Sequence, residues 1–72
     1  MKIYVNLLDE GTDVRYPVEA VPLSDYVYRI VGVNPDPDDL HWAFDTGTTV
    51  RCRPTVTSEG ETILVAFEEV AH

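Results

Sequence analysis

The chain has 72 residues, of which 44% are hydrophobic and 25% charged, so one small folded domain spanning residues 1–72 is expected. A domain of this size is too short for both a packed core and a deep catalytic cleft. Thirteen acidic residues against five basic ones give a formal net charge of −8, which repels phosphate and argues against direct nucleic-acid binding. The single cysteine, Cys52, cannot form an internal disulfide, which favours a reducing cytoplasm. The first ten residues match neither a signal peptide nor a membrane span.

Apolar residues alternate with polar ones along the first part of the chain, a period-two pattern that predicts β-strands. The alternation covers residues 2–7 and, after a glycine-containing turn predicted at residues 9–12, residues 14–21. Pro17 cannot donate a hydrogen bond to a neighbouring strand, so the second strand should lie at an edge or bend there. Residues 22–25 are predicted to end this strand.

Residues 26–31 are predicted to form a third strand, with Tyr28 and Ile30 facing the same side of the sheet. Gly32 then opens a long connection. A short element at residues 42–44 follows before the next turn.

The last third of the chain predicts two further strands. Residues 50–56 alternate, with Val56 among the side chains expected to face the core. A tight turn at residues 58–61 precedes residues 62–70, which are almost continuously apolar. β-Branched residues favour a strand over a helix in this segment, and its length suggests that one end is covered on both faces.

The predicted elements define the fold class. No segment combines helical spacing with helix caps. Five or six short strands cannot lie flat without leaving one face of the sheet bare to water. An all-β, SH3-like, partly open barrel of five to six strands is therefore expected.

One segment resembles a calcium-binding loop. Asn34, Asp36 and Asp38 match the first three ligand positions of the twelve-residue pattern. However, Asp39 stands where that pattern needs glycine, and Asp45 stands where it needs glutamate. Two prolines in the segment also bias the backbone toward an extended form that does not wrap an ion. A stiff polar connector, with neither a metal nor a cofactor, is the preferred interpretation.

The patterns associated with catalysis are also incomplete. The triplet at residues 45–47, Asp-Thr-Gly, is typical of aspartic proteases, which need two such aspartates and a later apolar-apolar-glycine segment that the sequence lacks. Cys52 alternates with Arg51 and Arg53, so it should point into the core and not act as a nucleophile. The two arginines should pair with acids on facing strands, or else form a small basic patch. No enzymatic activity is expected.

The strongest candidate for a binding surface is residues 34–44, NPDPDDLHWAF. Its closely spaced acids should face water. These acids are Asp36, Asp38 and Asp39. Leu40 and Trp42 should pin the far end of this stiff arm to the barrel. Trp42 either closes one end of the core or is partly exposed beside the acids, where it would suit a lysine or arginine through charge and cation–π contact. Tyr16 is a second candidate aromatic contact.

Four segments of the chain together follow a recognisable order. They are EGTDVRYPVEA (10–20), YRIVG (28–32), WAFDTGTTVRC (42–52) and LVAFE (64–68). This order resembles a family of small bacterial proteins without an assigned activity, whose pattern is GTxV…PVxA, YRI, an acidic proline-rich loop and WxF…GxxVRC. Arg15-Tyr16 stands here where that family has a tryptophan-arginine pair. The resemblance implies an all-β fold and a bacterial cytoplasmic setting, but no mechanism.

Two functions are compatible with these features. The first is a protein-interaction module that binds a basic segment of a partner through its acidic and aromatic surface. The alternative is an acidic mimic or antitoxin-like inhibitor of a nucleic-acid-binding protein, for which the summed charge matters more than any few residues. Both require a protein partner with a basic surface, and neither a membrane nor a small-molecule ligand is expected.

Overall fold

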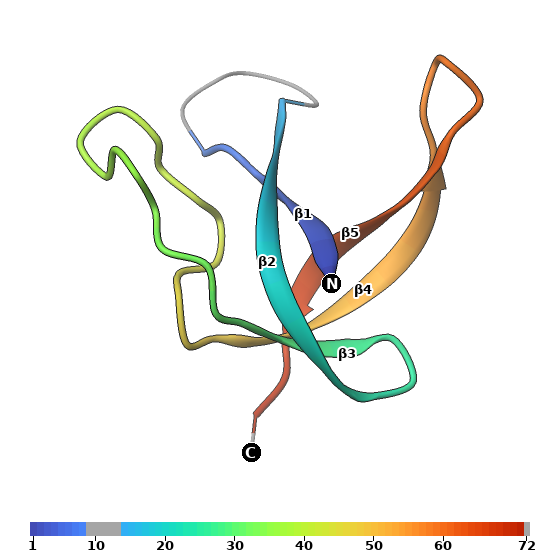
Figure 1. The fold of residues 1–72 in the computed structure, drawn as a ribbon, viewed down its shortest axis with the longest axis horizontal. Coiled ribbons are helices and arrows are strands. Elements are labelled where there is room, and N and C mark those ends of the chain that lie inside the picture. The colour runs from blue at the N-terminus through green and yellow to red at the C-terminus, as the bar shows by residue number, and fades with distance from the viewer. Residues whose placement is uncertain (9–13, 72) are drawn as a thin grey trace.

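Alternating strands build a five-stranded barrel in the computed structural model, which describes residues 1–8 and 14–71 (Figure 1). The strands are β1 (Lys2–Asn6), β2 (Arg15–Ser24), β3 (Val27–Ile30), β4 (Thr49–Val56) and β5 (Thr62–Glu69). They form a closed ring in the order β1-β2-β3-β4-β5. The expected all-β small barrel is confirmed, with five strands. Within the described residues there is no helix that could cross a membrane.

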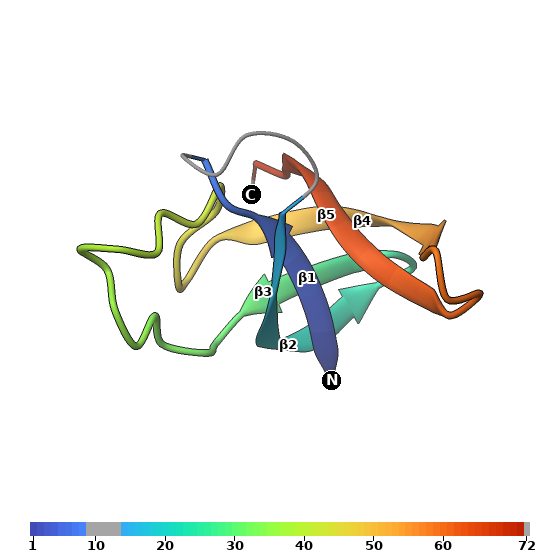
Figure 2. The same ribbon diagram turned by 90° about the horizontal axis from the view of Figure 1, so that it is seen from above.

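Sequential strands pair antiparallel, and the ring closes where β1 meets β5 in parallel, with Tyr4 opposite Val65. This seam is short, in keeping with the partly open barrel that was expected. The long strand β2 pairs with two strands, with β1 along its first half and with β3 along its second half. Figures 1 and 2 show β2 bending from one neighbour to the other along the barrel wall.

Three prolines lie within strands, and each occupies a position where its strand pairs with a neighbouring strand on only one side. Pro17 lies opposite Tyr4 of β1, Pro22 opposite Tyr28 of β3, and Pro54 opposite Leu64 of β5. A proline lacks the N–H that a central strand position would use on its second side, so such one-sided positions tolerate it. The expected edge or bend at Pro17 is therefore confirmed.

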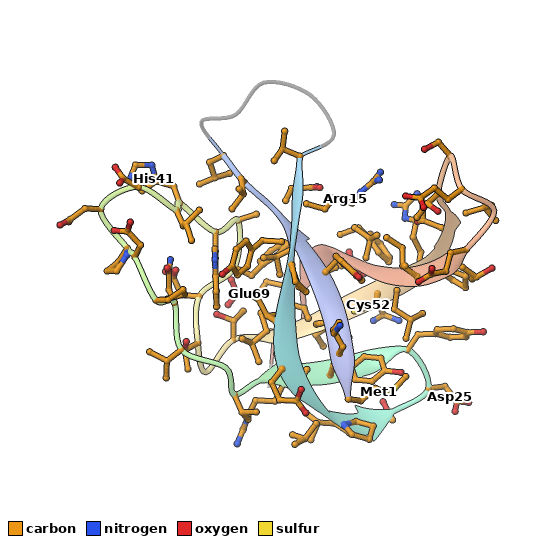
Figure 3. The ribbon with its side chains drawn as sticks, turned by 45° about the horizontal axis from the view of Figure 1, so that its top comes forward. Met1, Arg15, Asp25, His41, Cys52 and Glu69 are labelled. Atoms are coloured by element: carbon orange, nitrogen blue, oxygen red, sulfur yellow. The ribbon has the colours of Figure 1, made fainter. Side chains whose placement is uncertain are left out.

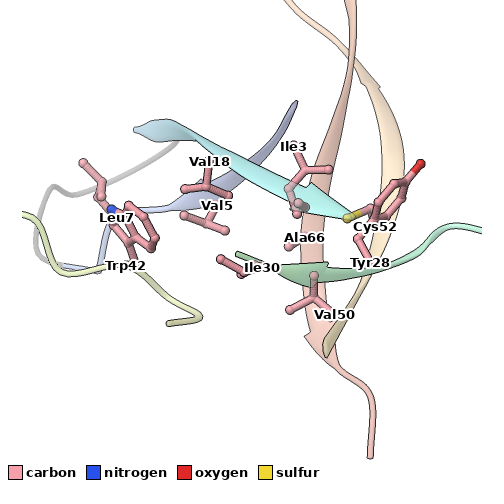
Figure 4. Packing of buried hydrophobic residues seen from close by; sticks show 11 residues of the cluster. Ile3, Val5, Leu7, Val18, Tyr28, Ile30, Trp42, Val50, Cys52 and Ala66 are labelled. Atoms are coloured by element: carbon pink, nitrogen blue, oxygen red, sulfur yellow. The ribbon is translucent and has the colours of Figure 1, made fainter. Parts of the chain in front are cut away.

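The core is formed by the inward-facing residues of all five strands (Figure 4). Its fully buried large side chains are Ile3, Val5, Ile30 and Val50. Tyr28 and Cys52 lie toward one end of this cluster, whereas Leu7 and Trp42 lie together at the other end. The period-two alternation of the sequence thus identifies the inward face of most strands.

The strand ends differ from the sequence prediction in two places. The second strand does not end at Pro22 but continues to Ser24, and Tyr26 occupies the following turn with a positive φ of 61°. Val56 was expected to face the core but is 68% exposed. It lies near the tip of the β4–β5 hairpin, which extends beyond the barrel, so no core remains beneath it (Figure 1).

The strand prediction for residues 62–70 is confirmed by β5. Burial on both faces occurs at Val65 and Ala66, in the middle of the strand and not at one end. The register between β4 and β5 shifts after Ala66, and Phe67 has no partner in it. The predicted turn at residues 9–12 lies outside the described residues.

Gly32 fixes the point where the chain leaves β3. A Cβ atom at this position would lie 2.9 Å from the backbone nitrogen of Glu19. The backbone N–H groups of Val31 and Gly32 both donate to the carbonyl of Glu19, which explains the close approach. Glycine is required here because a side chain would push the connection away from β2.

Candidate partner-binding surface

The connection between β3 and β4 closes into a compact loop around Asn34. The Asn34 side-chain amide donates from Nδ2 to the carbonyl of Leu40 at 2.6 Å, and its Oδ1 accepts from the N–H of Asp36 at 2.9 Å. The carbonyl of Asp36 accepts from the N–H groups of Asp39 and Leu40, at 3.1 and 2.7 Å. We call residues 34–40 the acidic loop. Its order comes from these hydrogen bonds as well as from its two prolines.

The far end of this loop is fastened to the open edge of β1. The N–H of Leu8 donates to the carbonyl of His41, and the N–H of Ala43 donates to the carbonyl of Asn6, both at 2.8 Å. Leu7 and Trp42 form an antiparallel bridge between these bonds. The short element predicted at residues 42–44 is therefore this bridge, not a full strand, and the predicted pinning of the arm is confirmed.

Trp42 is buried, with 5% of its surface exposed, so the expectation of a partly exposed ring is wrong. Residues directly opposite each other in an antiparallel pair point to the same face of the sheet. Leu7 points into the core, and Trp42 therefore points inward with it (Figure 4). The alternative interpretation, in which the ring closes one end of the barrel, describes its position.

Tyr16 lies beside Trp42 and is half-buried against the core. The two ring centroids are 5.8 Å apart, with the planes tilted by 34°. Their contact is a packing interaction within the barrel end. The indole Nε1 of Trp42 is buried, and no acceptor among the described residues lies within hydrogen-bond distance of it.

The five candidate residues thus separate into two groups. Asp36, Asp38 and Asp39 are exposed on the acidic loop, and their predicted orientation toward water is confirmed. Trp42 and Tyr16 pack at the end of the barrel, so Trp42 cannot offer its face to a cation there. What the loop presents to a partner is a cluster of carboxylates on an ordered backbone.

The arginines of β4 contact side chains on β5. The Arg51 Nε atom lies 2.7 Å from the Glu68 Oε1 atom, directly across the two strands. The guanidinium of Arg53 lies over the ring of Phe67, 4.2 Å from its centroid. The predicted cross-strand pairing with an acid is confirmed for Arg51, whereas Arg53 makes a cation–π contact.

Cys52 lies in the core with 3% of its surface exposed. Burial raises the pKa of its thiol from the ordinary 9.0 to about 11, because the apolar surroundings disfavour the thiolate. The thiol is therefore protonated at neutral pH and does not have the character of a nucleophile. Its expected role as a small core residue is confirmed.

The other chemical patterns take part in local structure. The N–H of Thr48 donates to the carbonyl of Asp45, so the protease-like triplet forms a turn, in which Gly47 has a φ of 91°. Both polar atoms of the Asn34 side chain are engaged within the acidic loop. Across residues 1–8 and 14–71, no three histidine, cysteine, aspartate or glutamate side chains are placed to hold a metal ion.

A groove of about 380 Å³ was not anticipated from the sequence. It lies between the barrel wall formed by β1 and β2 and the tip of the β4–β5 hairpin. Its lining residues are Tyr4, Arg15, Thr57, Glu59, Glu61 and Ile63. They come from separate segments, and only the closure of the ring brings them together. Figure 3 shows Arg15 and His41 on opposite sides of β2, so the groove and the acidic loop are separate surfaces.

Comparison of the chain with models of protein families, with curated proteins and with solved structures finds no match. Two features of the molecule itself are candidate binding surfaces. One is the acidic loop, and the other is the groove beside the β4–β5 hairpin.

Proposed function

We propose that this protein is a non-catalytic protein-interaction module that binds a basic segment of a partner protein through its acidic loop. The observation that carries the proposal is the exposure of three aspartates on a loop that is closed by hydrogen bonds and fastened to the barrel. These aspartates are Asp36, Asp38 and Asp39. A loop ordered before binding loses less conformational entropy when a partner engages it, so its charges contribute more to affinity.

Electrostatics supports a basic partner. The chain carries a formal net charge of −8, so a positively charged protein is attracted at long range and like-charged proteins are repelled. Exposed ion pairs contribute about 0–1 kcal/mol each, so three of them give only modest affinity. Binding through this loop should therefore be fast, weak and strongly reduced by salt.

The buried Cys52 supports a non-catalytic protein in the cytoplasm. The thiol of Cys52 is buried and protonated, which suits a structural residue in a reducing compartment. The resemblance to small bacterial proteins without an assigned activity agrees with such a role. Nucleic acids, membranes and small molecules are not the ligands that we propose.

The distribution of the acids favours one alternative, an acidic mimic that inhibits a nucleic-acid-binding protein. Exposed carboxylates occur well away from the acidic loop, at Asp25 in the β2–β3 turn and at Glu59 and Glu61 in the β4–β5 turn. In a mimic the summed field of these groups would determine binding. In a module the acidic loop would determine it.

A charge-matched pair of variants distinguishes the two functions. The loop variant carries Asp36→Asn, Asp38→Asn and Asp39→Asn, and the control carries Asp25→Asn, Asp45→Asn and Glu69→Gln, so each loses three negative charges. Partners captured from a bacterial lysate by the wild-type protein are identified by mass spectrometry, and their binding to both variants is then measured at low and high salt.

We expect the loop variant to lose capture while the control retains it. Equal losses in both variants would favour the mimic. Full capture by both variants would reject a charge-based function altogether. Circular dichroism of each variant checks that the barrel is intact, which is expected because all six substitutions are at exposed positions.

A further inference from the structure

The groove beside the β4–β5 hairpin contains an open edge of the sheet. β5 meets β1 with Val65 opposite Tyr4, and its earlier residues 62–64 pair only with β4. Within the described chain no strand pairs with the other side of these three residues. Figures 1 and 2 show the hairpin turning away from β1 and β2 over this stretch. Ile63 lines the groove that results.

The direction of the backbone groups follows from the hairpin ladder. The N–H of Thr57 donates to the carbonyl of Glu61, so these opposed residues form a hydrogen-bonded pair. Bonded pairs alternate along an antiparallel ladder, which makes Thr55 and Ile63 the next bonded pair. Thr62 therefore points its N–H and carbonyl away from β4, and the N–H of Leu64 points the same way. These three groups form the open edge.

The hairpin turn gives this edge a negative border. The Thr57 hydroxyl oxygen accepts from the N–H groups of Glu59 and Glu61, at 3.3 and 3.2 Å, which fixes the backbone of the turn. Gly60 completes the turn with a φ of 83°. The two glutamate side chains are exposed and line the groove. A cationic side chain lying along the edge would meet these two carboxylates, which outnumber the single cation among the described residues that line the groove, Arg15.

Side chains on both sides of the groove supply contact surface, Tyr4 from β1 and Ile63 from β5. Tyr4 and Ile63 are half-buried and leave part of their side chains facing the groove. A volume of about 380 Å³ is at the small end of the range for binding sites, which suits a few residues of an extended peptide. Strands add to exposed sheet edges through main-chain hydrogen bonds, and side-chain contacts supply the specificity.

We propose that this groove accepts an extended, lysine- or arginine-bearing segment of a partner protein as an added strand on β5. The peptide backbone pairs with Thr62 and Leu64, and a basic side chain lies against Glu59 and Glu61. This site is separate from the acidic loop, so the inference goes beyond the function proposed above and does not depend on it.

The test uses a capped eight-residue peptide of alternating lysine and valine as the probe. Its matched controls are the same peptide with N-methyl groups on alternate backbone nitrogens, which cannot pair as a strand, and a glutamate–valine peptide of opposite charge. Binding is followed by the backbone amide resonances of ¹⁵N-labelled protein at low salt. We expect the lysine–valine peptide to shift the amides of Thr62 and Leu64, and neither control to do so.

Two variants test the backbone and the charge separately. Thr62→Pro removes an N–H at the open edge without removing a ladder bond to β4, and it should weaken binding by about tenfold or more. Glu59→Gln with Glu61→Gln should weaken binding by about fivefold and reduce its salt dependence. If Thr62→Pro perturbs the fold, the N-methylated peptide still tests the strand pairing.

Several outcomes would overturn the proposal. These are no binding of the lysine–valine peptide by wild type, equal binding of its N-methylated form, or amide shifts confined to the acidic loop. Pairing of β5 with a second copy of the chain, seen as a dimer by sedimentation of the free protein, would also replace it. The triple asparagine variant of the acidic loop should leave the peptide-induced shifts of the Thr62 and Leu64 amides unchanged, and loss of these shifts in that variant would assign the peptide to the loop instead.

Discussion

The position of Trp42 predicts a large and specific loss of stability on truncation. A buried aromatic side chain removes about 150–250 Å² from water, which corresponds to about 4–6 kcal/mol at about 25 cal/mol/Å². Replacing such a ring with alanine typically costs about 3–5 kcal/mol, since the cavity collapses only in part. A chain of 72 residues has a total free energy of unfolding of only about 4–11 kcal/mol. Trp42→Ala should therefore remove between about a quarter and all of the stability.

Trp42→Phe is the matched control. It retains most of the ring and its contact with Tyr16, and it deletes an indole N–H that has no acceptor among the described residues. Removing a buried unsatisfied donor recovers about 1–3 kcal/mol, which offsets the smaller apolar area. We expect Trp42→Phe to lie within about 1 kcal/mol of wild type.

The assay is urea unfolding followed by far-ultraviolet circular dichroism, because the substitution removes the only tryptophan and with it the main fluorescence signal. A loss below about 1 kcal/mol for Trp42→Ala would refute the role of the ring as the closure of the barrel end. A Trp42→Phe variant as unstable as Trp42→Ala would instead show that the indole N–H has a partner essential to the fold.

Three further predictions address other parts of the molecule. Asn34→Ala removes two hydrogen bonds of the acidic loop. The amide of Leu40 should therefore exchange with solvent about tenfold faster or more, while the global free energy of unfolding changes little. Unchanged exchange would show that the prolines alone order the loop. Tyr26→Asn should stabilise the protein by about 0.5–1 kcal/mol in thermal unfolding, because asparagine tolerates a positive φ better than tyrosine, and a loss would point to a contact of the Tyr26 ring. The raised pKa of the Cys52 thiol makes the free energy of unfolding depend on pH. This free energy should keep its full value below pH 9 and fall by about 1.4 kcal/mol per pH unit up to about pH 11, because the thiol of the unfolded chain ionises first. Comparison of urea unfolding of wild type and Cys52→Ala across this range isolates the effect, and parallel pH profiles would contradict it.

The sequence predicts the strands well because each depends on local alternation. Tyr28 and Ile30 face the core as expected, since burial on one face of a strand leaves a period of two in the chain. Val56 breaks the same rule, because alternation does not show where a hairpin extends past the core that its neighbours cover. Strand identity is therefore local information, whereas the depth of each residue depends on the closed ring.

The candidate site depended on tertiary information to a greater degree. The exposure of Asp38 and Asp39 follows from their charge and spacing. The direction of Trp42 does not, because it is decided by a bridge to Leu7, which lies far away in the sequence. The groove residues Glu59 and Arg15 come from opposite parts of the chain, and no spacing within either segment indicates that they share a surface.

The seam between β1 and β5 also bears on the order in which the protein folds. Every other pairing joins strands that follow one another in the chain, whereas Tyr4 and Val65 lie near opposite ends of the sequence. Joining distant segments costs more chain entropy than closing a local hairpin, so the seam should form after the β2–β3 and β4–β5 pairs. A substitution at Tyr4 that weakens the seam leaves the β4–β5 pair intact, so it should speed unfolding more than it slows folding. On a ribosome, the ring cannot close until the last strand has emerged.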